Sequence, residues 1–180
     1  MFKHIIDNDV ELRLLDIHYA EEMFKSIDSC REHLKEYLPW VDYTNCIEDT
    51  INFIESSKKQ YAANNGFDAG IWYKDKFAGV IGFHSINPSI KEISIGYWLD
   101  EIFIGKGIMT KACKAFVDYA FNTFQLNRVE IRCAEDNLKS RAIPVRLGFT
   151  KEGILRDTEC FNEHYANCVV YGMLKREWWS

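Results

Sequence analysis

The sequence has little proline and no segment that is rich in proline, glycine and serine. Only 3 of its 180 residues are proline, and no stretch has the composition of a flexible linker. The chain also lacks internal repeats and low-complexity segments, which argues against a repeat array or a disordered protein. Because 180 residues can bury a sizeable core, we expect a single domain over residues 1–180.

Clusters of positive charge are also missing. The 22 Lys and Arg residues are outnumbered by 27 Asp and Glu residues, and the formal net charge is -5. A general nucleic-acid binder needs a basic face that releases counterions from the phosphate backbone. We therefore expect no nucleic-acid partner, although a local basic patch around one small anionic ligand is compatible with this charge.

The sequence lacks the signals of membrane insertion, secretion and zinc binding. No apolar run approaches the roughly 20 residues that span a bilayer, and no charged segment followed by an apolar one marks a secretory signal. None of the cysteines forms a C-x-x-C pair, so a zinc site is not expected. We predict mostly free core thiols, no membrane partner and a reducing cytoplasmic location. The cysteines are Cys30, Cys46, Cys113, Cys133, Cys160 and Cys168.

Hydrophobic periodicity predicts helices and strands in a mixed order. The predicted helices cover residues 16–27, 31–37, 48–63, 108–124 and 137–147. The predicted strands cover residues 10–15, 67–73, 77–86, 92–99, 129–133, 149–156 and 165–174. This order indicates an α+β fold with a mixed, mostly antiparallel sheet of six to seven strands, covered by helices on both faces. Because a helix separates strands 92–99 and 129–133, we expect these two to be parallel neighbours.

A glycine-containing loop stands between a strand and a helix in the stretch YWLDEIFIGKGIMTKAC, residues 97–113. A Walker A loop requires Ser or Thr after its lysine, but Lys106 is followed by Gly107. A dinucleotide fingerprint requires a third glycine where Thr110 stands. A shorter loop with Gly105 and Gly107 could direct backbone N–H groups at a pyrophosphate, supported by the helix dipole. The loop by itself is equally compatible with a plain turn.

A second motif follows in AEDNLKSRAIPVRLGFTKEGILRD, residues 134–157. Asn137, Ser140, Arg146 and the Gly148-Phe149 pair form the pattern N-x-x-S-x-x-hydrophobic-x-x-[KR]-x-G-F. Together with the glycine loop, this pattern resembles the GCN5-related N-acetyltransferase (GNAT) family. The likeness extends over nearly the whole chain and points to the bacterial branch that acetylates the N-terminal alanine or serine of ribosomal proteins.

The resemblance implies acetyl-coenzyme A as cofactor and a primary amine as acceptor, above all a protein N-terminal α-amine. Backbone groups of the glycine loop would hold the pyrophosphate. The pantetheine arm would pair like an added strand, and the N–H of either Trp98 or Leu99 would polarise the thioester carbonyl. Asn137 would bond the end of the pantetheine. The implied cofactor-binding residues are Tyr97, Trp98, Leu99, Ile104, Gly105, Lys106, Gly107, Ile108, Met109, Asn137 and Ser140.

The resemblance also suggests how protons are moved. Glu159 is the first candidate for the base that removes a proton from the amine, and Glu92 is the second. Ser94 stands where many relatives carry a glutamate. Ser140 would protonate the departing thiolate, although a serine at this position can also open a helix by bonding backbone. Asn167 stands where relatives often have aspartate.

Two other functions stay open at this point. The same fold could acetylate a small molecule such as a polyamine, an amino acid or an aminoglycoside. A protein that only binds acyl-CoA would need the glycine loop but neither Glu159 nor Ser140, so the presence of both favours an enzyme. The sequence does not identify the acceptor or the oligomeric state, although a homodimer would be unsurprising in this family.

Overall fold

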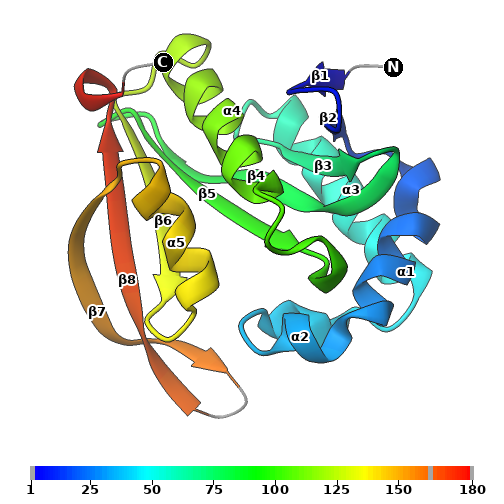
Figure 1. The fold of residues 1–180 in the computed structure, drawn as a ribbon. Helices are drawn as coiled ribbons and strands as arrows, with labels where there is room; N and C mark the ends of the chain where they lie inside the picture. The colour runs from blue at the N-terminus through cyan, green and yellow to red at the C-terminus, as the bar shows by residue number, and fades with distance from the viewer. Residues whose placement is uncertain (1–2, 162–163, 179–180) are drawn as a thin grey trace. The chain divides into compact units, whose positions relative to one another are not determined.

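The computed structural model describes residues 3–161 and 164–178. The chain divides into two compact units, each formed by two stretches of sequence. The first unit consists of Met1–Gly82 and Tyr97–Ile108, and the second of Phe83–Gly96 and Met109–Ser180. A single domain over the whole chain stays a prediction. Each unit is described by itself below, with the labels of Figure 1.

The first unit combines three helices with the antiparallel neighbours β1-β2-β3-β4. Its strands are β1 (Lys3–Ile5), β2 (Val10–Leu14), β3 (Asp68–Tyr73) and the first part of β4 (Lys76–Asn87). Its helices are α1 (Ala20–Ser29), α2 (Arg31–Lys35) and α3 (Ile47–Ala62), drawn in blue to cyan in Figure 1.

The core of the first unit forms around one face of α1. Ala20, Met23 and Ile27 are buried there, at the spacing that places side chains on one side of a helix. Trp72 and Phe77 belong to the same apolar cluster, and their rings meet edge to face with centroids 5.2 Å apart. Aromatic pairs in this geometry add to the stabilisation by burial. The helical period in the sequence predicted one face with Ala20, Met23, Phe24 and Ile27, of which Phe24 is only half-buried and the other three are buried.

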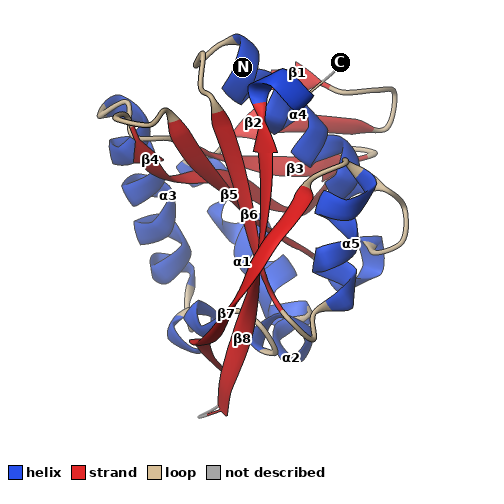
Figure 2. Cartoon of the chain, turned by 90° about the vertical axis from the view of Figure 1, so that its left-hand side faces the viewer, coloured by secondary structure: helices blue, strands red, loops and turns tan. Residues whose placement is uncertain are grey.

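The second unit contains the order β5-β6-β8-β7. It includes the first part of β5 (Glu92–Leu99), most of α4 (Ile108–Asn122), β6 (Arg128–Ala134), α5 (Leu138–Arg146), β7 (Thr150–Phe161) and β8 (His164–Leu174). Strands β5 and β6 are parallel, which confirms the prediction, whereas β8 is antiparallel to both β6 and β7. Figure 2 shows β7 twisting across β8.

The core of the second unit lies along α4. Ala112, Phe116 and Ala120 are buried on this helix, and the Phe116 ring packs against that of Phe83 with centroids 4.5 Å apart. Val129 and other buried residues of β6 add to this core. A helix that buries one apolar stripe needs such a partner surface, because its stability comes mainly from packing.

Two expectations about the strands were wrong. The described residues contain eight strands, not six to seven, because the three-residue β1 is too short to produce a recognisable alternation. Strand β7 continues to Phe161, beyond the predicted end at Arg156. Its pairing with β8 shifts register between Leu155 and Glu159. This irregularity breaks the period of two, so the pattern in the sequence indicated an end where the strand only bulges.

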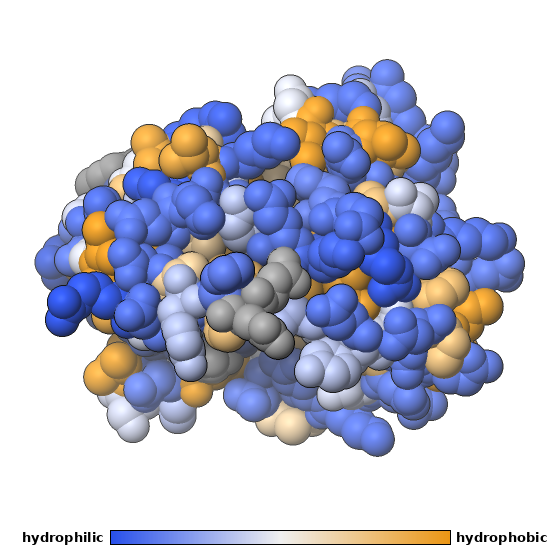
Figure 3. All heavy atoms as spheres, turned by 90° about the horizontal axis from the view of Figure 1, so that it is seen from below, coloured by the Kyte–Doolittle hydropathy of each residue, from blue (hydrophilic) through white to orange (hydrophobic). Residues whose placement is uncertain are grey.

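The described helices are all too short or too polar to cross a lipid bilayer. On the face drawn in Figure 3, hydrophobic residues occur in small groups that hydrophilic residues separate. Isolated hydrophobic residues are common on protein surfaces.

The six cysteines fall into two groups. Four are buried, namely Cys30, Cys113, Cys133 and Cys168, whereas Cys46 and Cys160 are exposed, and none of these six described cysteines forms a disulfide. Burial raises the pKa of Cys30 and of Cys168 to about 11. Burial also raises the pKa of Cys113 well above its usual value. Most cysteines are thus core thiols, as the sequence predicted.

This division predicts how the thiols react with a disulfide reagent such as DTNB at pH 8. We expect the two exposed thiols to react rapidly in the native protein. The four buried thiols should react only after unfolding in urea, because burial disfavours the thiolate, which is the reactive form. The double variant Cys46→Ser/Cys160→Ser should lose the rapid phase. Three or more rapid thiols in the native protein would contradict the described core.

Candidate functional site

A buried carboxylate, that of Asp100, directly follows the last residue of β5. Asp100 is 4% exposed, and its Oδ2 accepts a hydrogen bond from the Ser26 hydroxyl of α1 at 2.8 Å. Its Oδ1 accepts from the Ile102 backbone N–H at 3.2 Å, and its own N–H donates to the Ala78 carbonyl at 2.8 Å. Buried charge needs partners of this kind. The start of the glycine-containing segment is therefore fixed to both α1 and β4.

A short 3₁₀ helix, Glu101–Phe103, follows Asp100. The ammonium of Lys106 folds back over this turn and donates to the Ile102 carbonyl at 2.6 Å. It also lies 5.1 Å from the centroid of the Phe103 ring, within the range of a cation–π contact. The Lys106 ammonium thus contacts groups of its own loop. A contact between this ammonium and a phosphate stays a prediction.

The two glycines of the loop have a backbone conformation that suits a cradle for an anion. Gly105 has φ of +82° and Gly107 has φ of +73°, and a Cβ added at either position would meet nothing within 4 Å. Helix α4 begins directly afterwards, at Ile108, so its first N–H groups have no partner inside the helix. Left-handed glycines that face open space before a helix N-terminus fit the pyrophosphate of coenzyme A.

The other cofactor-binding residues predicted in the first unit lie at the end of β5. Trp98 is buried, and its ring packs near those of Trp40 and Phe77, with centroids 6.0 Å and 5.9 Å away. The neighbouring Tyr97 and Leu99 are half-buried. This packing anchors the Trp98 side chain in the core, so Trp98 would meet a ligand through its backbone.

Asn137 and Ser140 open α5 in the second unit. Asn137 is the residue before the helix, and its side-chain oxygen accepts from the Ser140 backbone N–H at 3.0 Å, as an N-cap does. The Ser140 hydroxyl oxygen lies 3.1 Å from the sulfur of Cys133 on β6. The capping group is therefore the amide of Asn137, and the hydroxyl of Ser140 contacts a thiol.

The two candidate bases have different surroundings. Glu92 accepts from Arg128 Nε at 2.5 Å, and Arg128 also pairs with Glu130 and Glu152. These three carboxylates, Glu152 foremost, raise the pKa of Arg128. Protonating Glu92 would weaken this network. Glu159 lies half-buried on β7 and forms no ion pair with the residues that the structure describes, which favours it over Glu92.

The parallel pairing of β5 with β6 also locates Ser94. The register joins Glu92 to Arg128 and Ser94 to Glu130, and the Ser94 hydroxyl donates to the His84 carbonyl at 2.9 Å. Ser94 therefore supplies a hydrogen bond inside the sheet.

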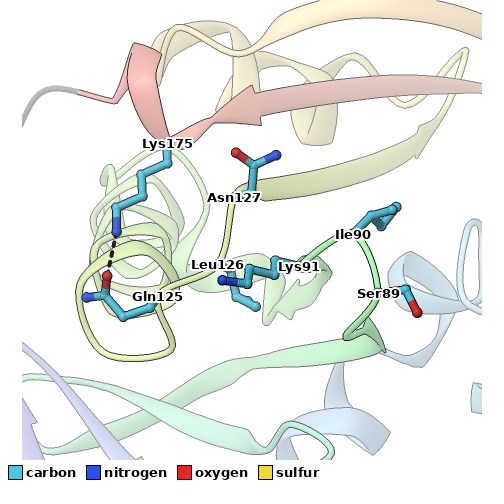
Figure 4. A pocket seen from close by; sticks show the side chains of 7 residues that line it. All are labelled: Ser89, Ile90, Lys91, Gln125, Leu126, Asn127 and Lys175. Atoms are coloured by element: carbon cyan, nitrogen blue, oxygen red, sulfur yellow. Dashed lines mark hydrogen bonds between the residues drawn. The ribbon is translucent and has the colours of Figure 1, made fainter.

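A hollow of about 500 Å³ in the second unit contains none of the predicted site residues (Figure 4). It is lined by Ser89, Ile90, Lys91, Gln125, Leu126, Asn127 and Lys175. The ammonium of Lys175 donates to Gln125 Oε1 at 2.7 Å across one side of it. None of the lining residues is a predicted cofactor-binding or catalytic residue. The candidate site therefore consists of the predicted residues and does not include this hollow.

Two residues near the predicted site were not among the sequence-based candidates, and their importance depends on contacts distant in sequence. Ser26 supports Asp100 from 74 positions away, and Glu135 bonds Asn167 from 32 positions away. No local pattern could have identified such pairs. Among the described residues, no cluster of His, Cys, Asp or Glu could hold a metal ion.

Comparison with known proteins identifies relatives of this chain. The family model for the acetyltransferase (GNAT) domain matches residues 9–150. YdaF of Bacillus subtilis (strain 168), named as a candidate ribosomal N-acetyltransferase, is 36% identical over 99% of this chain and 98% of its own. The ribosomal-protein-serine acetyltransferase of Escherichia coli (strain K12) is 28% identical over 94% of each chain.

Solved structures give the same result. The microcin C7 self-immunity acetyltransferase MccE, in complex with acetyl-CoA and AMP, has a TM-score of 0.90 at 32% identity and covers 94% of each chain. RimL, a ribosomal L7/L12 alpha-N-protein acetyltransferase in complex with coenzyme A, has a TM-score of 0.91 at 28% identity, covering 94% of this chain and 96% of its own. With a family model that matches most of its length, this chain belongs to the GNAT acetyltransferase family.

Proposed function

We propose that this protein transfers the acetyl group of acetyl-CoA to the N-terminal α-amine of a protein, as a ribosomal-protein type of N-acetyltransferase. The observation that carries the proposal is the likeness over nearly the full chain to RimL, an alpha-N-protein acetyltransferase solved with coenzyme A. Relatives named for the acetylation of ribosomal serine and alanine add support. A cytoplasmic location and a homodimer stay predictions.

The glycine loop would hold the cofactor's pyrophosphate. Backbone N–H groups from Ile104 to Met109 are the proposed donors, and the open space beside Gly105 and Gly107 would let a phosphate approach them. The backbone of Tyr97–Leu99 would pair with the amides of the pantetheine arm. Asn137, whose side-chain oxygen caps α5, would meet the end of that arm through its amide.

Acetyl-CoA supplies an activated acetyl thioester when bound. The α-amine of a peptide has a pKa of about 7.7–8.0, so its deprotonation near neutral pH costs only roughly 1 kcal/mol. Glu159 would accept that proton, directly or through water. The backbone N–H of Trp98 or Leu99 would donate to the carbonyl oxygen as negative charge develops on it. The hydroxyl of Ser140 would give a proton to the departing sulfur.

A second candidate function is acetylation of a small molecule. MccE, which confers self-immunity to microcin C7, was solved with acetyl-CoA and AMP and is 32% identical to this chain. Because acceptor sites are built from variable loops, the same cofactor loop can serve a different amine. A protein that only binds acyl-CoA is a third, weaker alternative, since it has no use for a base.

The first prediction from this proposal concerns the glycine loop. Gly107→Val should raise the dissociation constant for acetyl-CoA about tenfold or more, equal to 1.4 kcal/mol. A β-branched residue is strained at positive φ, and its side chain would occupy the space left for the phosphate. Isothermal calorimetry measures the affinity.

Gly153→Ala is the matched control, because Gly153 also has nothing within 4 Å of its added Cβ but does not lie at positive φ. Urea unfolding should show that both variants remain folded. If folded Gly107→Val bound acetyl-CoA with unchanged affinity, the loop would be excluded as the binding site of the pyrophosphate.

The second prediction concerns the base. Glu159→Gln keeps the shape of the side chain but cannot take a proton, so kcat should fall about 100-fold or more at pH 7 while acetyl-CoA affinity changes little. The deficit should shrink at pH 9, where the α-amine is already largely neutral. Steady-state rates from pH 6 to 9 measure both effects.

Glu152→Gln provides the control on the same strand, because Glu152 pairs with Arg128 and has no proposed catalytic part. A wild-type rate for Glu159→Gln across this pH range would exclude Glu159 as the base.

The third prediction concerns the acceptor. In an assay of coenzyme A thiol release, peptides with a free N-terminal serine or alanine should react faster than spermidine, free amino acids, aminoglycosides or an amine-bearing adenylate. A peptide blocked at its α-amine but retaining lysine is the matched control. Faster turnover of any small amine would favour the second candidate function instead.

A further inference from the structure

A bulge interrupts β7 shortly before Glu159. In the register with β8, Leu155 stands opposite Cys168 and Glu159 stands opposite Ala166. The three residues 156–158 of β7 are thus matched by Asn167 alone. The middle residue of this bulge, Asp157, has φ of +51°, which is uncommon outside glycine. A bulge redirects the side chains that follow it, so its conformation determines where the Glu159 carboxylate points.

The side chain of Asn167 holds this bulge. Its Oδ1 accepts from the Asp157 backbone N–H at 3.2 Å, and its Nδ2 donates to the Glu135 carboxylate at 2.7 Å. The Glu135 N–H also donates to the Asn167 backbone carbonyl at 2.8 Å. One end of the side chain meets a donor and the other an acceptor, so a primary amide satisfies both partners at once.

Glu135 connects this amide to the helix that carries Ser140. The Glu135 backbone carbonyl accepts from the guanidinium of Arg141, which also donates to the Tyr171 hydroxyl at 3.2 Å. Arg141 directly follows Ser140 in α5. A continuous set of hydrogen bonds therefore runs from the bulge before Glu159, through Asn167 and Glu135, to the first turn of α5. Figure 1 shows α5 beside the strands β6 and β8 of this unit.

We propose that Asn167 is a positioning residue, whose amide fixes the bulge of β7 so that Glu159 is held in place relative to Ser140. This role rests on the proposed function, in which these two residues move protons. An aspartate at position 167 could still accept from Asp157, but it would bring a second negative charge to Glu135. Like charges in contact repel, so the amide, rather than polarity in general, is the property that the structure requires.

The test compares Asn167→Asp, Glu135→Gln and the double variant in the full chain. Asn167→Asp should lose about tenfold or more in kcat, with the KM for acetyl-CoA within about twofold, because a misplaced base affects chemistry more than cofactor binding. Glu135→Gln alone should stay near the wild type, since its amide oxygen still accepts from Asn167. The double variant should recover most of the lost kcat, because the introduced glutamine amide can donate to the introduced aspartate carboxylate.

A structural measurement separates this inference from the proposed function. Amide hydrogen exchange at Asp157 should be faster in Asn167→Asp and return toward the wild-type rate in the double variant, whether or not an acceptor is known. The urea concentration at the midpoint of unfolding should be the same for the variants and the wild type, so that a global effect is excluded.

The outcomes differ clearly. Full kcat in Asn167→Asp, or a double variant as slow as Asn167→Asp at equal stability, would overturn the positioning role. A wild-type protein that acetylates no amine would refute the proposed function, while the exchange measurement would still decide whether the amide holds the bulge.

Discussion

The Asp100 carboxylate is buried and needs hydrogen-bond donors. The groups that supply them fix the path of the chain from β5 into the glycine loop. The carboxylate oxygens accept from the Ser26 hydroxyl and from the Ile102 N–H. Removing such a partner leaves a buried group unsatisfied, which costs about 1–3 kcal/mol or more for a charged group. The following turn is therefore tied to α1, and Gly105 and Gly107 begin from a defined position. A loop built in this way loses little entropy on binding a ligand.

The acidic residues of the second unit also differ in their ion-pair partners. Glu92 on β5, Glu130 on β6 and Glu152 on β7 all form ion pairs with Arg128, so these acidic side chains form a structural network. Such a network holds strand ends together but ties up the lone pairs that a base needs. Glu159 on β7 has no ion pair of this kind among the described residues. Surroundings, rather than residue type, decide which carboxylate can accept a proton.

Much of the fold could be predicted from short-range patterns. The 3.6-residue period identified the buried face of α1 because the spacing itself places Ala20, Met23 and Ile27 on one side. The helix between β5 and β6 implied their parallel pairing, since parallel strands need a long connection. Strand β1 escaped prediction because three residues carry too little pattern. The far end of β7 escaped it because the bulge at residues 156–158 interrupts the pairing with β8 and the regular pattern of side chains.

The family, the glycine loop and the candidate residues Asn137 and Ser140 could be read from motifs of closely spaced residues, and the family resemblance pointed to Glu159. The contacts of such residues follow from the folded structure. It pairs Glu92 with Arg128, engages Lys106 with its own loop, and places Asn167 between Asp157 and Glu135. Hydrogen bonds and charge pairs depend on distances in space, and Glu92 and Arg128, like Glu135 and Asn167, are distant in sequence. Such partners meet only once the sheet has fixed its register.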